Sequence, residues 1–259
     1  VYADHEVVAW DRDECDVMDA DDARDKITEL KPDLVFNCVA FNNVDGAETD
    51  QGQLAYELNA RVPGELASLT DELGIPFVHY STGYVFKGDD ADGYDETRET
   101  DPQNVYATTK RDGELEVLKH SNSYVIRLNW LFGPKAQSEG AKPSFVDMML
   151  GLAQDRDHLD LVDDESASPT YSHDLALRSR EIVENMPAGV YHSANTGSCT
   201  WKELAEEAFK IKGVSIDITP ISGARFKRPA NRPRYSELLC TKMAPLRPWQ
   251  EALKDYLQS

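Results

Sequence analysis

The segment Phe77-Val-His-Tyr-Ser-Thr82 is typical of a strand, and a helix-like segment, Asn104-Val-Tyr-Ala-Thr-Thr-Lys-Arg-Asp-Gly-Glu114, comes after it. Ala23, Ile27 and Leu30 follow helical spacing earlier in the chain. Further strand-like runs span residues 6–10, 34–39 and 124–128. Strands that alternate with helices are the pattern of a parallel sheet covered on both faces. The sequence therefore predicts an α/β fold with a Rossmann-like, doubly wound parallel sheet.

The alternation loosens beyond Phe132. Helices are expected over residues 145–154, 174–183 and 201–211, with short strands between them. The last of these helices has a capping box in Thr200-x-x-Glu203, in which the two side chains satisfy free backbone N–H groups at the helix start.

Composition excludes several classes of protein. The chain has 259 residues, 41% of them hydrophobic, and a formal charge of -20, which argues against a broad nucleic-acid surface. No run of 18 apolar residues and no secretion signal is present, so no membrane association is expected. The four cysteines form no Cys-x-x-Cys pair, which predicts a reduced cytoplasmic protein without a zinc or other metal site.

Tyr106 and Lys110 are four residues apart, so a helix places them on one face. The Lys110 ammonium is then expected near the Tyr106 phenol, where it favours the phenolate and lowers the phenol pKa. A phenol with the ordinary pKa of about 10 is a poor acid-base group at neutral pH. The pair therefore predicts a proton donor, and the alternative interpretation is an ordinary amphipathic helix.

Five basic residues crowd into ten positions near the end of the chain. If their side chains converge, they bind a diphosphate through charge-assisted hydrogen bonds. The alternative is a solvated basic loop. The five residues are Arg225, Lys227, Arg228, Arg232 and Arg234.

These motifs together resemble the extended short-chain dehydrogenase/reductase superfamily and, within it, the dTDP-4-dehydrorhamnose reductase family. The resemblance runs from about Glu6 to Leu257. The segments that carry it, besides those above, are Pro32-Asp-Leu-Val-Phe-Asn-Cys-Val-Ala40, Val44-Asp45-x-Ala47-Glu48, Val162-Asp-Asp-Glu-Ser-Ala-Ser-Pro-Thr170, Arg232-Pro-x-x-Ser236, Thr241-Lys242 and Pro248-Trp249-x-x-Ala252-Leu253.

The resemblance implies a dinucleotide-binding domain over residues 1–140 and a smaller α/β substrate domain over 141–259, with segments exchanged between the two. It implies reduction of the 4-keto group of a dTDP-linked 6-deoxy sugar by NADPH or NADH, as in the conversion of dTDP-4-dehydro-L-rhamnose to dTDP-L-rhamnose. A homodimer is a further expectation.

The resemblance also assigns roles to residues. Tyr106 is the proton donor, Lys110 lowers its pKa and holds the cofactor ribose, and Thr82 binds the carbonyl oxygen as charge develops there. Asp11 lies where an acidic residue binds the adenosine ribose, which favours NADH, whereas Arg12 suits the 2'-phosphate of NADPH. The remaining assignments are Ala40 and Asn59 near the cofactor, and Tyr84, Trp130, Arg232 and Arg234 around the substrate. Asn59 has the alternative of bracing its helix, and Trp130 that of filling the core.

The chain departs from the family pattern at three places. Gly83 replaces an aspartate and Ala107 replaces a glycine, which affects the shape of the sugar pocket. No Gly-x-x-Gly-x-x-Gly turn is present, although such a turn holds the pyrophosphate in this fold. We expect a strand-turn-helix unit of roughly 25 residues to precede Val1 and to lie between the strands at 6–10 and 34–39.

Two other functions remain open at this stage. A sugar-nucleotide epimerase or dehydratase shares the same three catalytic residues and the same fold. A non-catalytic regulatory subunit, of the methionine adenosyltransferase beta type, resembles the reductase and acts through protein contact. Intact Thr82, Tyr106 and Lys110 favour catalysis.

Overall fold

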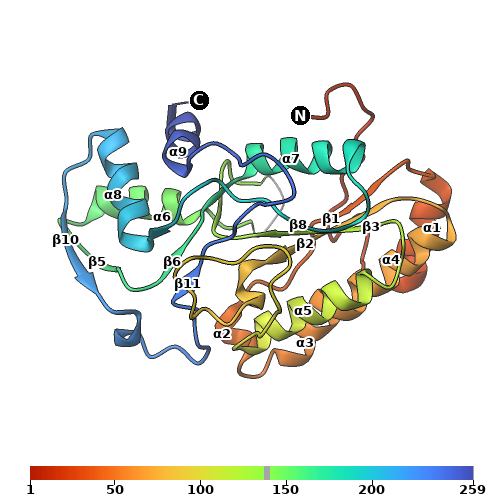
Figure 1. Ribbon diagram of the computed structural model, residues 1–259, viewed down its shortest axis with the longest axis horizontal. Helices are drawn as coiled ribbons and strands as arrows, with labels where there is room; N and C mark the ends of the chain where they lie inside the picture. The colour runs from red at the N-terminus through yellow and green to blue at the C-terminus, as the bar shows by residue number, and fades with distance from the viewer. Residues whose placement is uncertain (137–140, 259) are drawn as a thin grey trace.

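A parallel sheet lies at the centre of the computed structural model, which describes residues 1–136 and 141–258. Within these residues its strand order is β1-β2-β3-β8, and each neighbouring pair is parallel. The strands are β1 (Val35–Asn37), β2 (Phe77–Thr82), β3 (Ser123–Leu128) and β8 (Gly189–His192). Helices lie on both sides of this sheet (Figure 1), which confirms the predicted doubly wound α/β fold.

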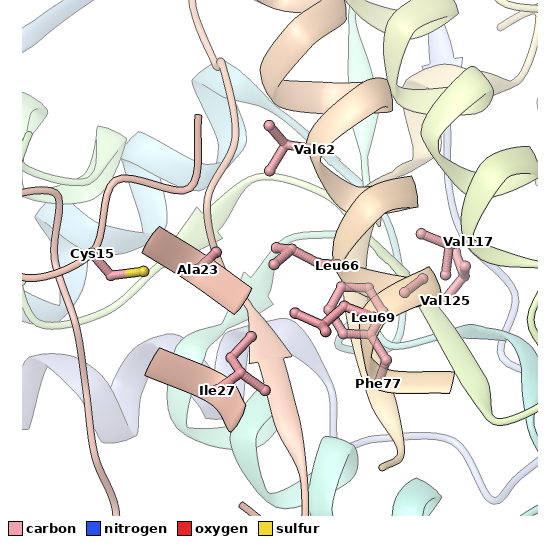
Figure 2. Packing of buried hydrophobic residues seen from close by; sticks show 10 residues of the cluster. Cys15, Ala23, Ile27, Val62, Leu66, Leu69, Phe77, Val117 and Val125 are labelled. Atoms are coloured by element: carbon pink, nitrogen blue, oxygen red, sulfur yellow. The ribbon is translucent and has the colours of Figure 1, made fainter. Parts of the chain in front are cut away.

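Three helices cover one face of the sheet. They are α1 (Ala20–Leu30), α4 (Val62–Glu72) and α5 (Val105–Val117). The apolar side chains of α1 and α4 recur at helical spacing, so they form stripes that meet Phe77 of β2. Figure 2 shows Ile27, Leu66 and Leu69 around the Phe77 ring, all buried.

A continuous helical segment leads into α4. It consists of α3 (Gly52–Tyr56) and a π-helical turn (Glu57–Arg61), and the short helix α2 (Val44–Ala47) precedes it. The π-helical turn contacts α5 closely, because a methyl group on Gly113 of α5 would lie 1.9 Å from the carbonyl oxygen of Asn59. Glycine at position 113 is what allows the two backbones to approach.

Helix α7 (Ser172–Asn185) covers the opposite face of the sheet (Figure 1). Its buried Leu175 and Ile182 pack on Val78 of β2 and Ile126 of β3. Both α7 and the outer strand β8 come from the segment after residue 140. The C-terminal part of the chain therefore supplies one strand and one helix to the central layer, and the boundary at residue 140 stays a prediction.

A second, smaller region contains helices α6 (Phe145–Asp155), α8 (Trp201–Lys212) and α9 (Trp249–Gln258). Its strands are β5 (His158–Val162) with β10 (Asp217–Ile221), β6 (Ser166–Ala167) with β9 (Cys199–Thr200) and β11 (Tyr235–Ser236), and β4 (Leu131–Phe132) with β7 (Thr170–Tyr171). The predicted capping box is present at the start of α8. The predicted helices at 145–154, 174–183 and 201–211 are confirmed to within three residues at each end.

The expected strand at residues 6–10 is wrong. This segment pairs with no strand among the described residues, and Val7 and Val8 are 66% and 45% exposed. A strand needs a hydrogen-bonded neighbour, and β1, which is shorter than the predicted 34–39, is the edge of the described sheet. An apolar run alone therefore did not decide the conformation here.

None of the helices in the described part of the chain is both long enough and apolar enough to cross a membrane. The expected cytoplasmic location and homodimer stay predictions.

Candidate active site

The end of β2 carries the first polar group of the site. Thr82 is the last residue of this strand, and its hydroxyl accepts a hydrogen bond of 3.2 Å from the Tyr84 backbone N–H in the following 3-10 turn, Gly83–Val85. The Gly83 N–H donates to Asn129 Oδ1 at 3.0 Å. A methyl group on Gly83 would lie 2.4 Å from Asn129 Nδ2, so this asparagine occupies the space that a larger residue at position 83 needs.

The first turn of α5 carries Tyr106. Asn104 caps this helix through a 2.7 Å bond from the Ala107 N–H, and the Glu48 carboxylate accepts the Val105 N–H at 2.9 Å. The Tyr106 ring is buried and hydrogen-bonds Thr82 through its hydroxyl. Its edge faces the Tyr84 ring, with centroids 6.2 Å apart and planes at 85°. The structure thus brings together Thr82, Tyr84 and Tyr106.

Lys110 lies one turn further along α5 and is 2% exposed. Its Nζ donates to the Tyr80 carbonyl oxygen at 2.6 Å and lies 3.3 Å from His79 Nε2. Burial lowers the pKa of Lys110 from 10.5 to about 8, against an opposing effect of Glu114. These contacts hold the amine against strand β2.

The predicted lowering of the Tyr106 pKa by Lys110 is wrong. Burial raises the pKa of Tyr106 to about 12, and the hydrogen bond with Thr82 opposes part of that rise. The physical reason is that desolvation disfavours the phenolate, while the Lys110 amine is directed to the Tyr80 carbonyl.

Asn59 braces the cofactor side of the site. Its side chain is fully buried in the π-helical turn. The Asn59 amide accepts the Phe41 N–H at 2.9 Å, donates to the Phe41 carbonyl at 3.1 Å and donates to the Thr109 hydroxyl at 3.1 Å. It therefore joins the loop after β1, where Ala40 lies half-buried, to the residue before Lys110.

Asp11 and Arg12 are exposed in a turn before α1. The Asp11 carboxylate accepts the Asp13 N–H at 2.9 Å, and the Asp11 N–H donates to Glu14 at 2.9 Å. These bonds hold the turn, and the roles of Asp11 and Arg12 toward a cofactor stay predictions.

The predicted substrate side is lined by aromatic rings. Trp130 has a positive φ of 39°, a strained conformation for a bulky residue, and its ring stacks on Trp201 at 3.5 Å. Burial raises the pKa of Tyr84, the nearby Arg232 opposes this rise and the nearby Glu165 adds to it. The indole N–H of Trp130 is buried without a hydrogen bond of normal geometry in the described residues.

The basic segment does not converge into one cluster of free charges. Arg232 binds Asp45 through bonds of 3.0 and 2.8 Å, and holds the pKa of this carboxyl below its usual range. Arg228 pairs with the buried Glu165, and Arg225 lies 3.7 Å from Asp160. Arg234 is exposed, with its guanidinium 5.1 Å from the Tyr235 ring. Three arginines are thus paired with separate acids, and two of them lie near Tyr84.

Four functional neighbours received no role from the sequence: His79, Asp45, Asn129 and Glu165. Asp45 and Glu165 lie in quoted motifs, which is the signal that pointed to them. His79 follows the two-residue period of β2, which places it on the same face as Phe77 and Ser81. Partnership with Lys110 depends on the packing of α5 and has no sequence signal.

The site offers a buried polar group that is free to bind a cofactor. Ser81 Oγ, next to Thr82, is buried without a hydrogen-bond partner in the described residues. This orphaned hydroxyl and the loop after β1 lie at the carboxyl ends of parallel strands, where dinucleotides bind in such sheets. Among residues 1–136 and 141–258 no group of three His, Cys, Asp or Glu side chains is arranged to hold a metal ion.

Known proteins match nearly the whole chain. The family model of the RmlD substrate binding domain matches residues 2–259. The dTDP-4-dehydrorhamnose reductase of Streptomyces griseus is 36% identical over 262 residues, covering 96% of this chain and 84% of that protein. The spore coat polysaccharide biosynthesis protein SpsK of Bacillus subtilis is 33% identical over 261 residues, covering 99% and 89%.

Solved structures match at the level of the fold and of the sequence. The dTDP-4-dehydrorhamnose reductase of Bacillus anthracis in complex with NADP has a TM-score of 0.93 and 30% identity, with 98% of this chain and 90% of that chain covered. A related structure from Clostridium acetobutylicum has a TM-score of 0.91 and 33% identity over the same shares of the two chains. The similarity therefore includes both the central sheet and the smaller region.

Proposed function

The chain belongs to the RmlD substrate binding domain family, and we propose that it is an NADPH-dependent reductase of the 4-keto group of a dTDP-linked 6-deoxy sugar. The observation that carries the proposal is the arrangement of Thr82, Tyr106 and Lys110 at the carboxyl end of β2. The names of the relatives from Streptomyces griseus and Bacillus anthracis support reduction over the epimerase, dehydratase and regulatory-subunit alternatives.

Each residue of the site has a separate task in this reaction. NADPH, when bound, supplies the hydride. Tyr106 gives its phenolic proton to the carbonyl oxygen as that oxygen gains charge, and Thr82, next to the phenol, binds the same oxygen. The raised pKa of Tyr106 keeps this proton in place before the reaction. Lys110, held against β2 by the Tyr80 carbonyl, is assigned to the ribose of the cofactor.

The substrate is held from the side of Tyr84. We assign the charge that a diphosphate needs to Arg234, which is exposed in the basic segment, and to Arg232, which Asp45 holds near Tyr84. The Trp130 ring, fixed by its stack on Trp201, forms an apolar wall for a deoxy sugar. In this proposal the sugar ring lies between Trp130 and Tyr106, with dTDP toward the basic segment.

NADPH is the preferred cofactor in this proposal. The related Bacillus anthracis structure contains NADP, and Arg12 is an exposed cation beside Asp11. A guanidinium suits the 2'-phosphate that distinguishes NADPH from NADH.

The test is oxidation of NADPH by the purified protein with dTDP-4-dehydro-L-rhamnose, with dTDP-L-rhamnose identified by mass spectrometry. The matched blank is the Tyr106→Phe variant, which lacks the proton donor. A rate no higher than that of the blank, in protein that binds NADPH, would contradict the proposed reaction.

A further inference from the structure

Three buried polar side chains form a chain of hydrogen bonds that ends at Lys110. Asn37 at the end of β1, His79 in β2 and Lys110 in α5 are 4%, 0% and 2% exposed. Asn37 Nδ2 lies 3.2 Å from His79 Nδ1, and His79 Nε2 lies 3.3 Å from Lys110 Nζ. Buried polar groups need partners with matching donors and acceptors. The order of donors and acceptors along these three side chains therefore affects which protonation state of Lys110 is favoured.

A backbone hydrogen bond determines which groups donate and which accept along this series of hydrogen bonds. The Val39 N–H donates to Asn37 Oδ1 at 3.0 Å, so the amide oxygen is used and the NH₂ group faces His79. An NH₂ group only donates, and His79 Nδ1 must therefore accept. A neutral imidazole carries one proton, so that proton is on Nε2, the nitrogen that faces Lys110.

This tautomer suits an amine better than an ammonium at Lys110. A neutral amine accepts the His79 Nε2–H through its lone pair and still donates to the Tyr80 carbonyl at 2.6 Å. An ammonium has three donors and no acceptor, so it would place two N–H groups against each other.

We propose that His79, oriented by Asn37, is a positioning residue that favours the neutral amine of Lys110 over its ammonium. Two observations agree with this. Burial and the Lys110 charge hold the pKa of His79 well below its ordinary value, so the imidazole stays neutral. The pKa of Lys110 itself is lowered to about 8.

The other titratable groups around Lys110 do not account for the preference for its neutral amine. Glu114, one turn further along α5, favours the ammonium but is itself paired with Arg127 of β3 through bonds that include one of 2.6 Å. Tyr106, one turn before Lys110, is held as a neutral phenol by burial. In the described residues no carboxylate lies within ion-pair distance of Lys110 Nζ.

The consequence for catalysis rests on the proposed function. If Lys110 holds the cofactor ribose as an ammonium, cofactor binding and turnover weaken as pH rises through the pKa of Lys110. His79 would then set the upper pH limit of the enzyme. The titration of Lys110 itself does not depend on the reaction and is tested without substrate.

The experiment follows the Cε signal of Lys110 by NMR in ¹³C-lysine-labelled protein over a pH titration, with Lys110→Met used only to assign the signal. In His79→Gln the new amide oxygen has two lone pairs and can accept from Asn37 and from the Lys110 ammonium together, so the Lys110 midpoint should rise by about one to two pH units. In His79→Leu the donor is lost and no acceptor replaces it, so the midpoint should rise by less than in His79→Gln. A merely structural role of His79 would leave the midpoint at its native value in both variants or lower it in both.

His120→Gln is the control, because His120 follows α5 and its Nδ1 lies 3.5 Å from Asp71 rather than near Lys110. It should leave the Lys110 midpoint unchanged. Should His79→Gln fail to fold, Asn37→Asp replaces it, since a carboxylate accepts the proton of Nδ1 and turns the Nε2 lone pair to Lys110. An unchanged or lower midpoint in the folded variant that offers the acceptor overturns the proposal.

Discussion

Arg232 binds Asp45 across 187 positions of sequence, with its two terminal nitrogens 3.0 and 2.8 Å from the two carboxylate oxygens. The pair joins the basic segment to α2, which follows the loop after β1. The Arg232 side chain is only 12% exposed and lies near Tyr84. Asp45 therefore holds this arginine in place beside the proposed substrate pocket before a diphosphate arrives.

Replacing Arg232 by alanine should weaken dTDP binding about ten- to a hundredfold, because a charge-assisted bond to phosphate is lost. Calorimetric titration with dTDP at low and high salt measures the effect, and the difference should shrink as salt rises. Arg225→Ala is the matched control from the same segment, since Arg225 is exposed and lies near Asp160. Equal affinity of the Arg232→Ala and native proteins would remove Arg232 from the substrate site.

The Tyr106→Phe variant should lose about 10²- to 10⁴-fold in turnover, the usual contribution of a positioned general acid. Its NADPH affinity should stay close to that of the native protein, because only the hydroxyl is removed. Steady-state NADPH oxidation and fluorescence titration with NADPH measure the two quantities.

Tyr80→Phe serves as the control for that experiment. The Tyr80 hydroxyl bonds Ser179 of α7 at 2.9 Å, on the other face of the sheet, while its backbone carbonyl still accepts from Lys110. Turnover of this variant should remain near native. If both tyrosine variants lose activity equally, the loss reflects packing and Tyr106 is not the proton donor.

Local patterns predicted the elements of the site but not their partners. The four-residue spacing of Tyr106 and Lys110 and the apolar run of β2 identified the helix and the strand, because both depend on neighbours close in sequence. The ion pair of Asp45 with Arg232 forms only when segments 187 positions apart meet. For the same reason, the contact that directs Lys110 to His79 and away from the phenol could not be foreseen.

The segment at residues 6–10 shows that local composition can also predict an element that the fold does not form. Val7, Val8 and Trp10 have the composition of a strand, but they remain 66%, 45% and 38% exposed because no described strand pairs with them. Strand preference expresses fit to a neighbouring strand and a covered face, so composition without a partner does not specify the conformation.

Gly113→Ala should destabilise the fold by about 1–3 kcal/mol, since the new methyl group would lie 1.9 Å from the Asn59 carbonyl oxygen. Gly151→Ala is the control within another helix, where no atom lies within 4 Å of the new methyl group. There the better helix propensity of alanine should stabilise by about 0.5–1 kcal/mol. Urea unfolding of the two variants measures both, and equal effects would contradict the close approach of α5 to the π-helical turn.

The stability of the protein should depend on pH through Lys110. Its pKa falls from 10.5 in an exposed lysine to about 8 in the folded chain, so the unfolded chain binds more protons between these two values. Stability contributed by this group therefore rises with pH across that window, and the destabilising effect of the buried ammonium is fully present below it. The difference between the two pKa values corresponds to about 3 kcal/mol in the free energy of unfolding.

Comparison with Lys110→Met isolates this contribution, because the other titrating groups are common to both proteins. Relative to the variant, the native protein should gain about 2–3 kcal/mol of unfolding free energy between a pH of about 7 and a pH of about 10. Loss of the bond to the Tyr80 carbonyl affects the variant at every pH and leaves the slope unchanged. Urea unfolding at a series of pH values measures the difference. A difference that stays constant with pH would mean that Lys110 titrates at its ordinary value, and the buried amine would then have no reason to be neutral beside His79.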